Sequence, residues 1–134
     1  MATYNKFNSF VEALAEKAHN LGSDTLMVAL TNSEPAATMT KLSELTGAIA
    51  SPALDSVTLT VSSSGQTSGT YKLVLADKTM TASGAVGPFR YVAIYNDTAT
   101  NKELICWYDY GSEVTLAKDD TFKLDFGDQL FSLA

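Results

Sequence analysis

Only a few side chains in this sequence are of the types that carry out chemistry. The chain has one histidine, His19, and one cysteine, Cys106. A histidine can transfer protons or bind a metal ion. His19, however, lies near the C-terminal end of a predicted helix, where the helix dipole favours its protonated form, so we interpret it as a capping residue at the surface. Cys106 lies within an apolar run, which predicts a buried thiol that acts as a small hydrophobic side chain.

Acidic residues near the end of the chain are the next candidates. Asp119, Asp120, Asp125 and Asp128 could together bind calcium, but they lack the glycine and the terminal glutamate of a calcium-binding loop. We interpret them as turn formers. The serine- and glycine-rich segments contain neither a nucleophile elbow nor the lysine of a phosphate-binding loop. The sequence therefore predicts no catalytic residue, no cofactor and no metal site, and an enzyme would need catalytic groups from a partner chain.

Composition favours one domain that spans residues 1–134. Its hydrophobic content of 46% is sufficient for a core without metals or disulfides. The net charge of −6 disfavours nucleic acid and anionic membrane surfaces as partners. The first residues lack the pattern of a secretory signal, and no apolar run approaches the ~20 residues that cross a bilayer. We therefore expect synthesis in a cytoplasm.

The sequence predicts that an N-terminal helix and a set of strands position these side chains. Apolar residues recur at steps of three and four from residue 7 to residue 21, which predicts an amphipathic helix over about 6–21. Ser9 and Glu12 fit a capping box, although an asparagine just upstream could begin the helix instead. Gly22 is well placed to end it.

A strand covered on both faces is predicted at 26–30, where five apolar residues follow one another. The next stretch, about 31–55, contains two prolines and is predicted to be a long connection with one short helical turn at 41–45. Such a connection is either a contact arm for a partner or a surface loop.

The remainder, about 56–134, alternates between apolar and polar residues and is predicted to be β-rich. The serine-rich segment 63–69 is predicted to be a loop. Strands at this spacing indicate a mainly β (α+β) fold, an antiparallel β-sandwich or barrel-like domain with the N-terminal helix against it. The predicted strands are 57–61, 70–76, 78–82, 89–95, 103–110, 113–116, 121–126 and a terminal pairing through 130–133.

Aromatic residues are predicted on both faces of one hairpin. Phe89, Tyr91 and Tyr95 share one strand face, and Trp107 lies opposite Tyr108 on the next strand. Tyrosine and tryptophan at a sheet surface are typical of protein interfaces, but packing beneath the helix would explain them equally well. A carbohydrate-binding platform would use the same residues.

Several segments together resemble a family of small virion proteins of tailed bacteriophages. The resemblance covers most of the chain and is weakest over the acidic end, 119–134. Its similar segments are 4–22, 30–32, 87–91, 95–101 and 107–111.

The resemblance implies a capsid decoration (cement) protein, located on the head exterior of the virion, that binds the major capsid protein and stabilises contacts between capsomers. By analogy it also implies a homo-oligomer, a trimer. A tail or head–tail connector protein and a carbohydrate-binding module on the particle surface are the alternatives. The N-terminal segment and the 31–55 connection are the expected contact elements, because the core explains them least. The candidate interface residues are Ala2, Thr3, Tyr4, Asn5, Lys6, Phe7, Trp107, Tyr108 and Tyr110.

Overall fold

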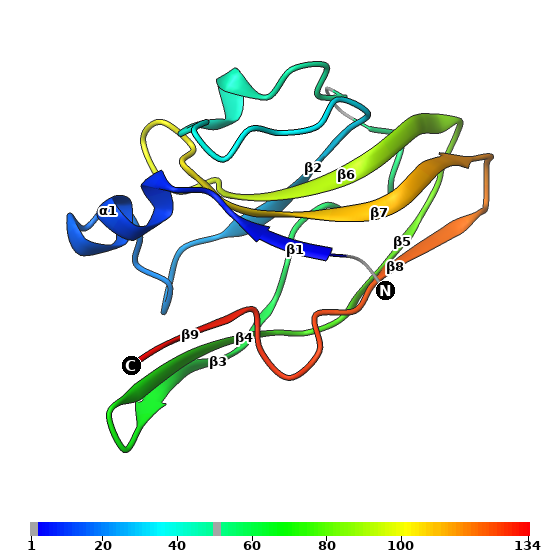
Figure 1. Ribbon diagram of the computed structural model, residues 1–134. Coiled ribbons are helices and arrows are strands. Elements are labelled where there is room, and N and C mark those ends of the chain that lie inside the picture. The colour runs from blue at the N-terminus through cyan, green and yellow to red at the C-terminus, as the bar shows by residue number, and fades with distance from the viewer. Residues whose placement is uncertain (1–2, 50–51) are drawn as a thin grey trace.

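A computed structural model describes residues 3–49 and 52–134, and this part of the chain is mainly β (Figure 1). All of its paired strands are antiparallel. In chain order the elements are β1 (Thr3–Lys6), α1 (Ser9–Ala15), β2 (Leu26–Thr31), the 3₁₀ turn η1 (Leu42–Glu44), β3 (Val61–Thr67), β4 (Thr70–Leu75), β5 (Lys78–Thr81), β6 (Val86–Asn96), β7 (Leu104–Leu116), β8 (Thr121–Leu124) and β9 (Phe131–Leu133).

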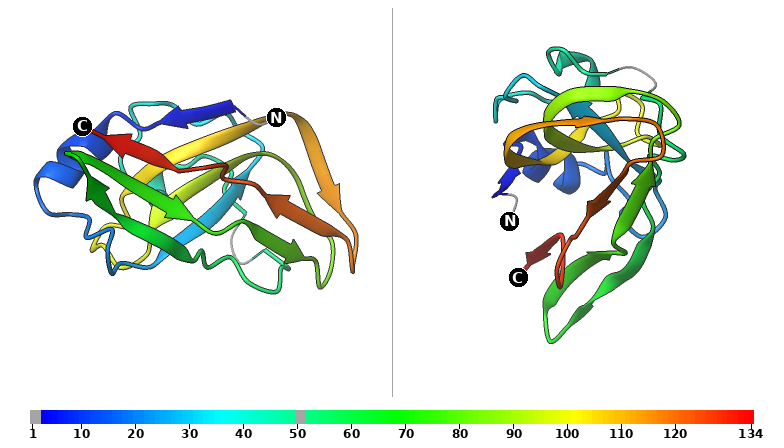
Figure 2. Two further views of the ribbon diagram at one scale, coloured as in Figure 1. Left: turned by 90° about the horizontal axis from the view of Figure 1, so that it is seen from below. Right: turned by 90° about the vertical axis from the view of Figure 1, so that its right-hand side faces the viewer.

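The strands form three sheets. The largest has the order β1-β7-β6-β2, a second has the order β3-β4-β9, and β5 pairs with β8. Figure 2 shows that the long hairpin of β6 and β7 runs across the molecule, with the two smaller sheets on one side of it. Over the described residues no sheet closes on itself, so the barrel alternative has no support there.

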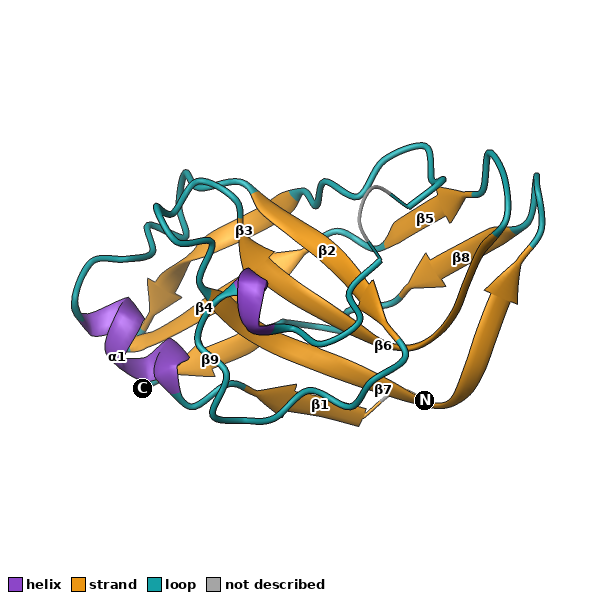
Figure 3. Ribbon diagram, turned by 90° about the horizontal axis from the view of Figure 1, so that it is seen from above, coloured by secondary structure: helices purple, strands orange, loops and turns teal. Residues whose placement is uncertain are grey.

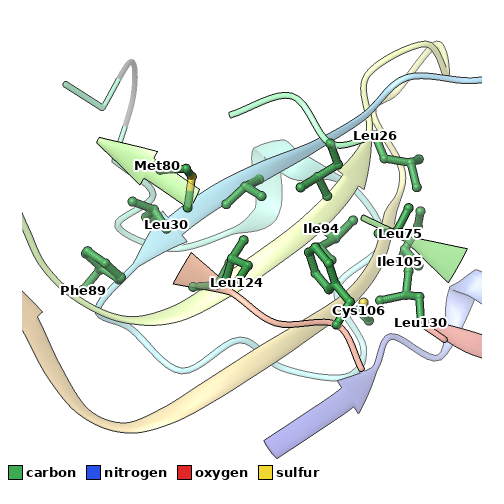
Figure 4. Close-up of a cluster of buried hydrophobic side chains, with 14 of the residues drawn as sticks. Leu26, Leu30, Leu75, Met80, Phe89, Ile94, Ile105, Cys106, Leu124 and Leu130 are labelled. Atoms are coloured by element: carbon green, nitrogen blue, oxygen red, sulfur yellow. The ribbon is translucent and has the colours of Figure 1, made fainter. Parts of the chain in front are cut away.

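The main core lies between the large sheet and the two small sheets (Figure 4). Leu30 and Ile94 come from the large sheet, whereas Leu75 and Leu124 come from the opposite layer, and all four are at most 2% exposed. Alternate residues of each strand point to the same face, so both layers supply one apolar row to this space. This burial is the main driving force for the fold.

A second, smaller core covers the other face of the large sheet. Trp107 and Tyr91 lie on that face, and Leu45 packs against them from the connection between β2 and β3. Figure 3 shows η1 and the chain around it crossing over the sheet. The predicted helical turn at 41–45 is therefore confirmed as a 3₁₀ turn. The described part of the connection covers the chain's own sheet, which explains it without a partner; residues 50 and 51 lie outside the described residues.

Burial on both faces explains the uninterrupted apolar sequence of β2. Five of its six residues are buried, as the strand prediction at 26–30 requires. The predicted common face of Phe89, Tyr91 and Tyr95 is wrong. Phe89 belongs to the main core, whereas the two tyrosines belong to the smaller one. The register of β6 shifts between Phe89 and Tyr91, and such an irregularity turns the side chains before it to the opposite face.

The predicted helix over 6–21 is wrong at both ends. Lys6 instead ends β1, the strand of residues 3–6 that pairs with β7, and α1 spans the seven residues Ser9–Ala15. It ends because Lys17 adopts a left-handed conformation with φ of 71°, which allows the amide of Ala18 to donate to the carbonyl of Ala13 at 2.9 Å. Asn8 is the N-cap residue and makes no side-chain capping bond, so the proposed capping box is absent as well.

The predicted loop over 63–69 is also wrong, because β3 occupies most of it. Ser68 and Gly69 have φ of 52° and 84°, the left-handed pair that a tight β-hairpin turn requires. The strand predicted over 57–61 is wrong, since β3 begins only at Val61 and Thr58 forms an isolated bridge to Met27. The break predicted between the strands 103–110 and 113–116 is absent, since β7 continues through Gly111. The strands predicted at 70–76, 78–82 and 121–126 and the terminal pairing are confirmed with shifts of a few residues.

Candidate functional site

The N-terminal strand lies at the edge of the large sheet. β1 pairs only with β7 in the strand order, so its other side is an open edge (Figure 3). The register sets Tyr4 opposite Tyr108 and Asn5 opposite Trp107. An open strand edge presents unpaired backbone groups that a strand from another chain can complete.

Three of the predicted interface residues meet beside this edge. The rings of Tyr4 and Tyr108 are 5.6 Å apart in an edge-to-face arrangement. Together with Tyr110 they line a cleft of about 290 Å³, whose opposite wall is formed by residues 124–127 and 129–130. The alternation of β7 explains the grouping, since residues 108 and 110 point to one face. We refer to these three side chains as the tyrosine edge.

The tyrosine edge is uncharged at neutral pH, because the ordinary pKa of a tyrosine is about 10. Desolvation is the largest influence on each phenol and raises the pKa of Tyr4, Tyr108 and Tyr110 above the usual value. Tyr4 nevertheless retains 36% of its surface exposed. The edge thus presents uncharged aromatic rings, which are common in protein interfaces.

The other predicted interface residues are distributed differently. Phe7 and Trp107 are 0% and 6% exposed and their rings lie 4.6 Å apart in the smaller core. These two residues therefore stabilise the chain itself and present no surface. Thr3 and Lys6 are exposed and Asn5 is half-buried. Ala2 lies outside the described residues.

The predicted surface position of His19 is wrong. The residue is 5% exposed, because α1 ends early and the following turn folds the imidazole inward against Phe10. Its Nδ1 lies 2.9 Å from Nδ2 of Asn96, and the same amide nitrogen donates to Asp24 Oδ2 at 2.7 Å. Desolvation lowers the pKa of His19, although Glu103 and Asp24 act in the opposite direction.

Asn96 is the central residue that sequence reasoning missed. It is fully buried at the end of β6, and its Oδ1 accepts from the amides of Thr98 and Ala99 at 3.0 and 3.2 Å. The strand predicted over 89–95 ends just before this residue, and the sequence Asn96-Asp97 is typical of a turn. The bonds to the amides of Thr98 and Ala99 are local and are typical of such a turn. The contact with His19 joins residues 77 positions apart, so a local pattern does not predict it.

The predictions for Cys106 and for the turn-forming Asp120 and Asp125 are confirmed. Cys106 is free and fully buried, and burial raises the pKa of its thiol. Asp120 accepts from the amide of Ala117 and Asp125 from that of Gly127, both at 2.9 Å, as turn-forming aspartates do. In residues 3–49 and 52–134 no three metal-binding side chains gather.

No protein-family model, curated protein or solved structure matches this chain. Among the helices of the described ranges, none is long and apolar enough to span a membrane.

Proposed function

We propose that this protein is a non-enzymatic structural component of a tailed-phage virion, a decoration protein that binds the major capsid protein on the outside of the head. The resemblance of its segments to small phage virion proteins supports the class of protein. The tyrosine edge supports the mode of attachment, because an open strand beside neutral aromatic rings suits docking onto a strand of another protein.

The open side of β1 carries this proposal. A capsid strand that pairs with β1 would extend the large sheet by backbone hydrogen bonds, while Tyr4 and Tyr110 provide side-chain contacts at the same edge. In this mode residues 3–6 provide part of the contact with the capsid, as expected for the N-terminal segment. It does not use Phe7 or Trp107.

We also propose a β-sandwich-like classification for the domain. The large sheet and the two small sheets face one another across a single main core, which is the arrangement of a sandwich. A rigid domain of this kind, assembled as a trimer, would bridge neighbouring capsomers. Each contact is modest, but many copies acting together raise the temperature and the pressure at which the shell fails.

The decisive experiment is cryo-electron microscopy of the intact particle. We expect density for this chain on the outer shell, at symmetry axes between capsomers, with β1 against the capsid protein. Density confined to the neck or the tail would overturn the decoration role in favour of a connector. The same map measures the oligomeric state.

A binding assay tests the attachment mode separately. Tyr4→Ala should weaken binding to heads stripped of this protein by about tenfold or more, as the loss of an interface aromatic does. Val11→Ala is the matched control, since Val11 is 55% exposed on α1, away from the edge, and should bind normally. Equal binding of both variants would contradict docking at the tyrosine edge. A deletion of residues 2–5 is a poorer test, because it also removes most of β1 and its pairing with β7.

A further inference from the structure

A second and larger hollow lies away from the tyrosine edge. It is an open cleft of about 940 Å³ between the end of α1, the hairpin of β3 and β4, and the turn that joins β6 to β7. Its lining is rich in hydroxyl, amide and carboxylate groups, with one aromatic ring from Tyr71. His19 and Glu103 both belong to this lining.

The hydrogen bonds of Asn96 fix the proton on His19. Because Oδ1 of Asn96 accepts from two backbone amides and its Nδ2 donates to Asp24, the orientation of this amide is set. The second hydrogen of Nδ2 then points to Nδ1 of His19, which must accept. The imidazole is therefore neutral and carries its proton on Nε2.

Two buried polar atoms beside the cleft lack partners in the described part of the chain. One is Nε2 of His19, a donor, and the other is Oε2 of Glu103, an acceptor. Buried polar groups are nearly always satisfied in native proteins, so an unpaired donor and acceptor in one lining point to a missing group. A hydroxyl fits this need, because it accepts from one group and donates to the other.

The other residues that line the cleft indicate the chemical class of its ligand. Ser64 and Tyr71 share a hydrogen bond of 2.7 Å at one wall, and Asn20, Thr100 and Asn101 add further polar groups. Only one cation, Lys17, accompanies the carboxylates of Asp24 and Glu103 in the lining, which disfavours an anionic ligand. Several hydroxyl-bonding groups beside an aromatic ring suit a ligand that is polar at its hydroxyls and apolar on its ring face.

We propose that this cleft binds a neutral carbohydrate, with one sugar hydroxyl held between His19 Nε2 and Glu103. Since both atoms are buried, binding of the hydroxyl requires the Glu103 side chain to rotate toward the cleft. The proposal goes beyond attachment at the tyrosine edge and does not depend on it. A trapped water would satisfy the same two atoms without a sugar, and the experiment distinguishes the two cases.

The test is a titration of the full chain with glucose, galactose, mannose and N-acetylglucosamine, followed by ¹H–¹⁵N NMR. We expect at least one sugar to give saturable shifts at the backbone amides that line the cleft, together with a shift of His19 Nε2. The absence of saturable shifts with all four sugars at high millimolar concentration would overturn the proposal and leave a bound water as the partner.

Two variants locate the binding. Glu103→Ala should lower the affinity at least tenfold, whereas Glu34→Gln, which alters an exposed carboxylate outside the cleft lining, should leave it unchanged. Where Glu103→Ala unfolds, Thr100→Ala at the exposed rim should weaken binding instead. Unchanged affinity in the folded cleft variants would contradict the proposal. Because these readouts involve no capsid, failure of the decoration role would not affect them.

Discussion

At the residue scale, the buried polar network around Asn96 holds the segment after α1 against the turn that follows β6. The amide of Asn96 joins His19 in the segment after α1 to Asp24 and to the turn after β6. A fully buried amide with this many bonds is costly to disturb, because any group left without a partner keeps its desolvation penalty. The network therefore ties the N-terminal segment to the central hairpin.

The pH dependence of stability tests this network. The pKa of His19 is lowered in the folded protein, so the unfolded chain takes up the proton first as the pH falls. The stabilising contribution of neutral His19 is present above the ordinary histidine pKa of about 6.5 and is lost as the pH falls through the folded value.

We expect the melting temperature of the wild-type protein to fall between pH 7 and pH 5 more steeply than that of His19→Asn. The asparagine carbonyl can accept from Asn96 in place of Nδ1 but does not titrate. Parallel pH profiles from thermal unfolding of the two proteins would show that His19 is not held neutral by its burial.

At the element scale, two features shape the large sheet: the irregular start of β6 and the cover supplied by the connection between β2 and β3. Gly87 has φ of 109°, and a Cβ added there would lie 2.7 Å from the carbonyl oxygen of Val114 on the paired strand. The two strands can therefore approach each other this closely only because residue 87 is a glycine.

Gly87→Ala should destabilise the protein by at least about 3 kcal/mol. A positive φ alone costs an alanine about 1–3 kcal/mol, and the clash of the added Cβ with the Val114 carbonyl adds to this. Gly65→Ala is the control: it lies in exposed β3, where an added Cβ meets nothing within 4 Å, and we expect little change. Urea unfolding of both variants measures the difference, and equal stabilities would contradict the close approach at Gly87.

The cover over the smaller core can be tested with the single tryptophan. Leu45→Ala should cost about 2–5 kcal/mol and leave the ring of Trp107 less shielded, because Leu45 is 6% exposed and packs in the same cluster. Urea unfolding measures the loss, and a red shift of the native tryptophan emission reports the exposure. Wild-type emission and stability would mean that the connection is not the cover of this face.

At the scale of the whole molecule, a chain with a net charge of −6 carries a docking edge whose aromatic side chains are neutral and whose β1 strand has one charged residue, Lys6. The tyrosines of this edge are uncharged at neutral pH, so backbone hydrogen bonds and ring contacts would dominate the proposed docking. Salt screens charge interactions but has little effect on such contacts.

Binding to stripped heads should therefore change by less than about threefold between low and physiological salt, where interactions between exposed charges are screened over about 8–10 Å. Sedimentation of the heads with bound protein at each salt concentration measures this. A steep fall in affinity with added salt would point to attachment through charged groups elsewhere on the surface.

The local sequence pattern predicted those elements whose burial follows directly from the periodicity of their apolar residues. The continuous apolar run of β2, most strands after β4, the buried thiol of Cys106 and the turn-forming aspartates follow from periodicity and side-chain chemistry. The mainly β, antiparallel fold follows from the same signals. The grouping of Tyr108 and Tyr110 on one face was likewise readable from alternation along β7.

Contacts between distant segments decided the rest. The helical pattern over 6–21 gave way at its start because Lys6 belongs to β1 and pairs with β7, a contact that a helix prediction does not weigh. His19 was assigned to a surface because its partner, Asn96, lies far along the chain. The sequence alone determined which residues are apolar and that most of the chain forms strands. The tertiary structure alone decided which polar groups are buried together, since that depends on which distant segments pack against each other.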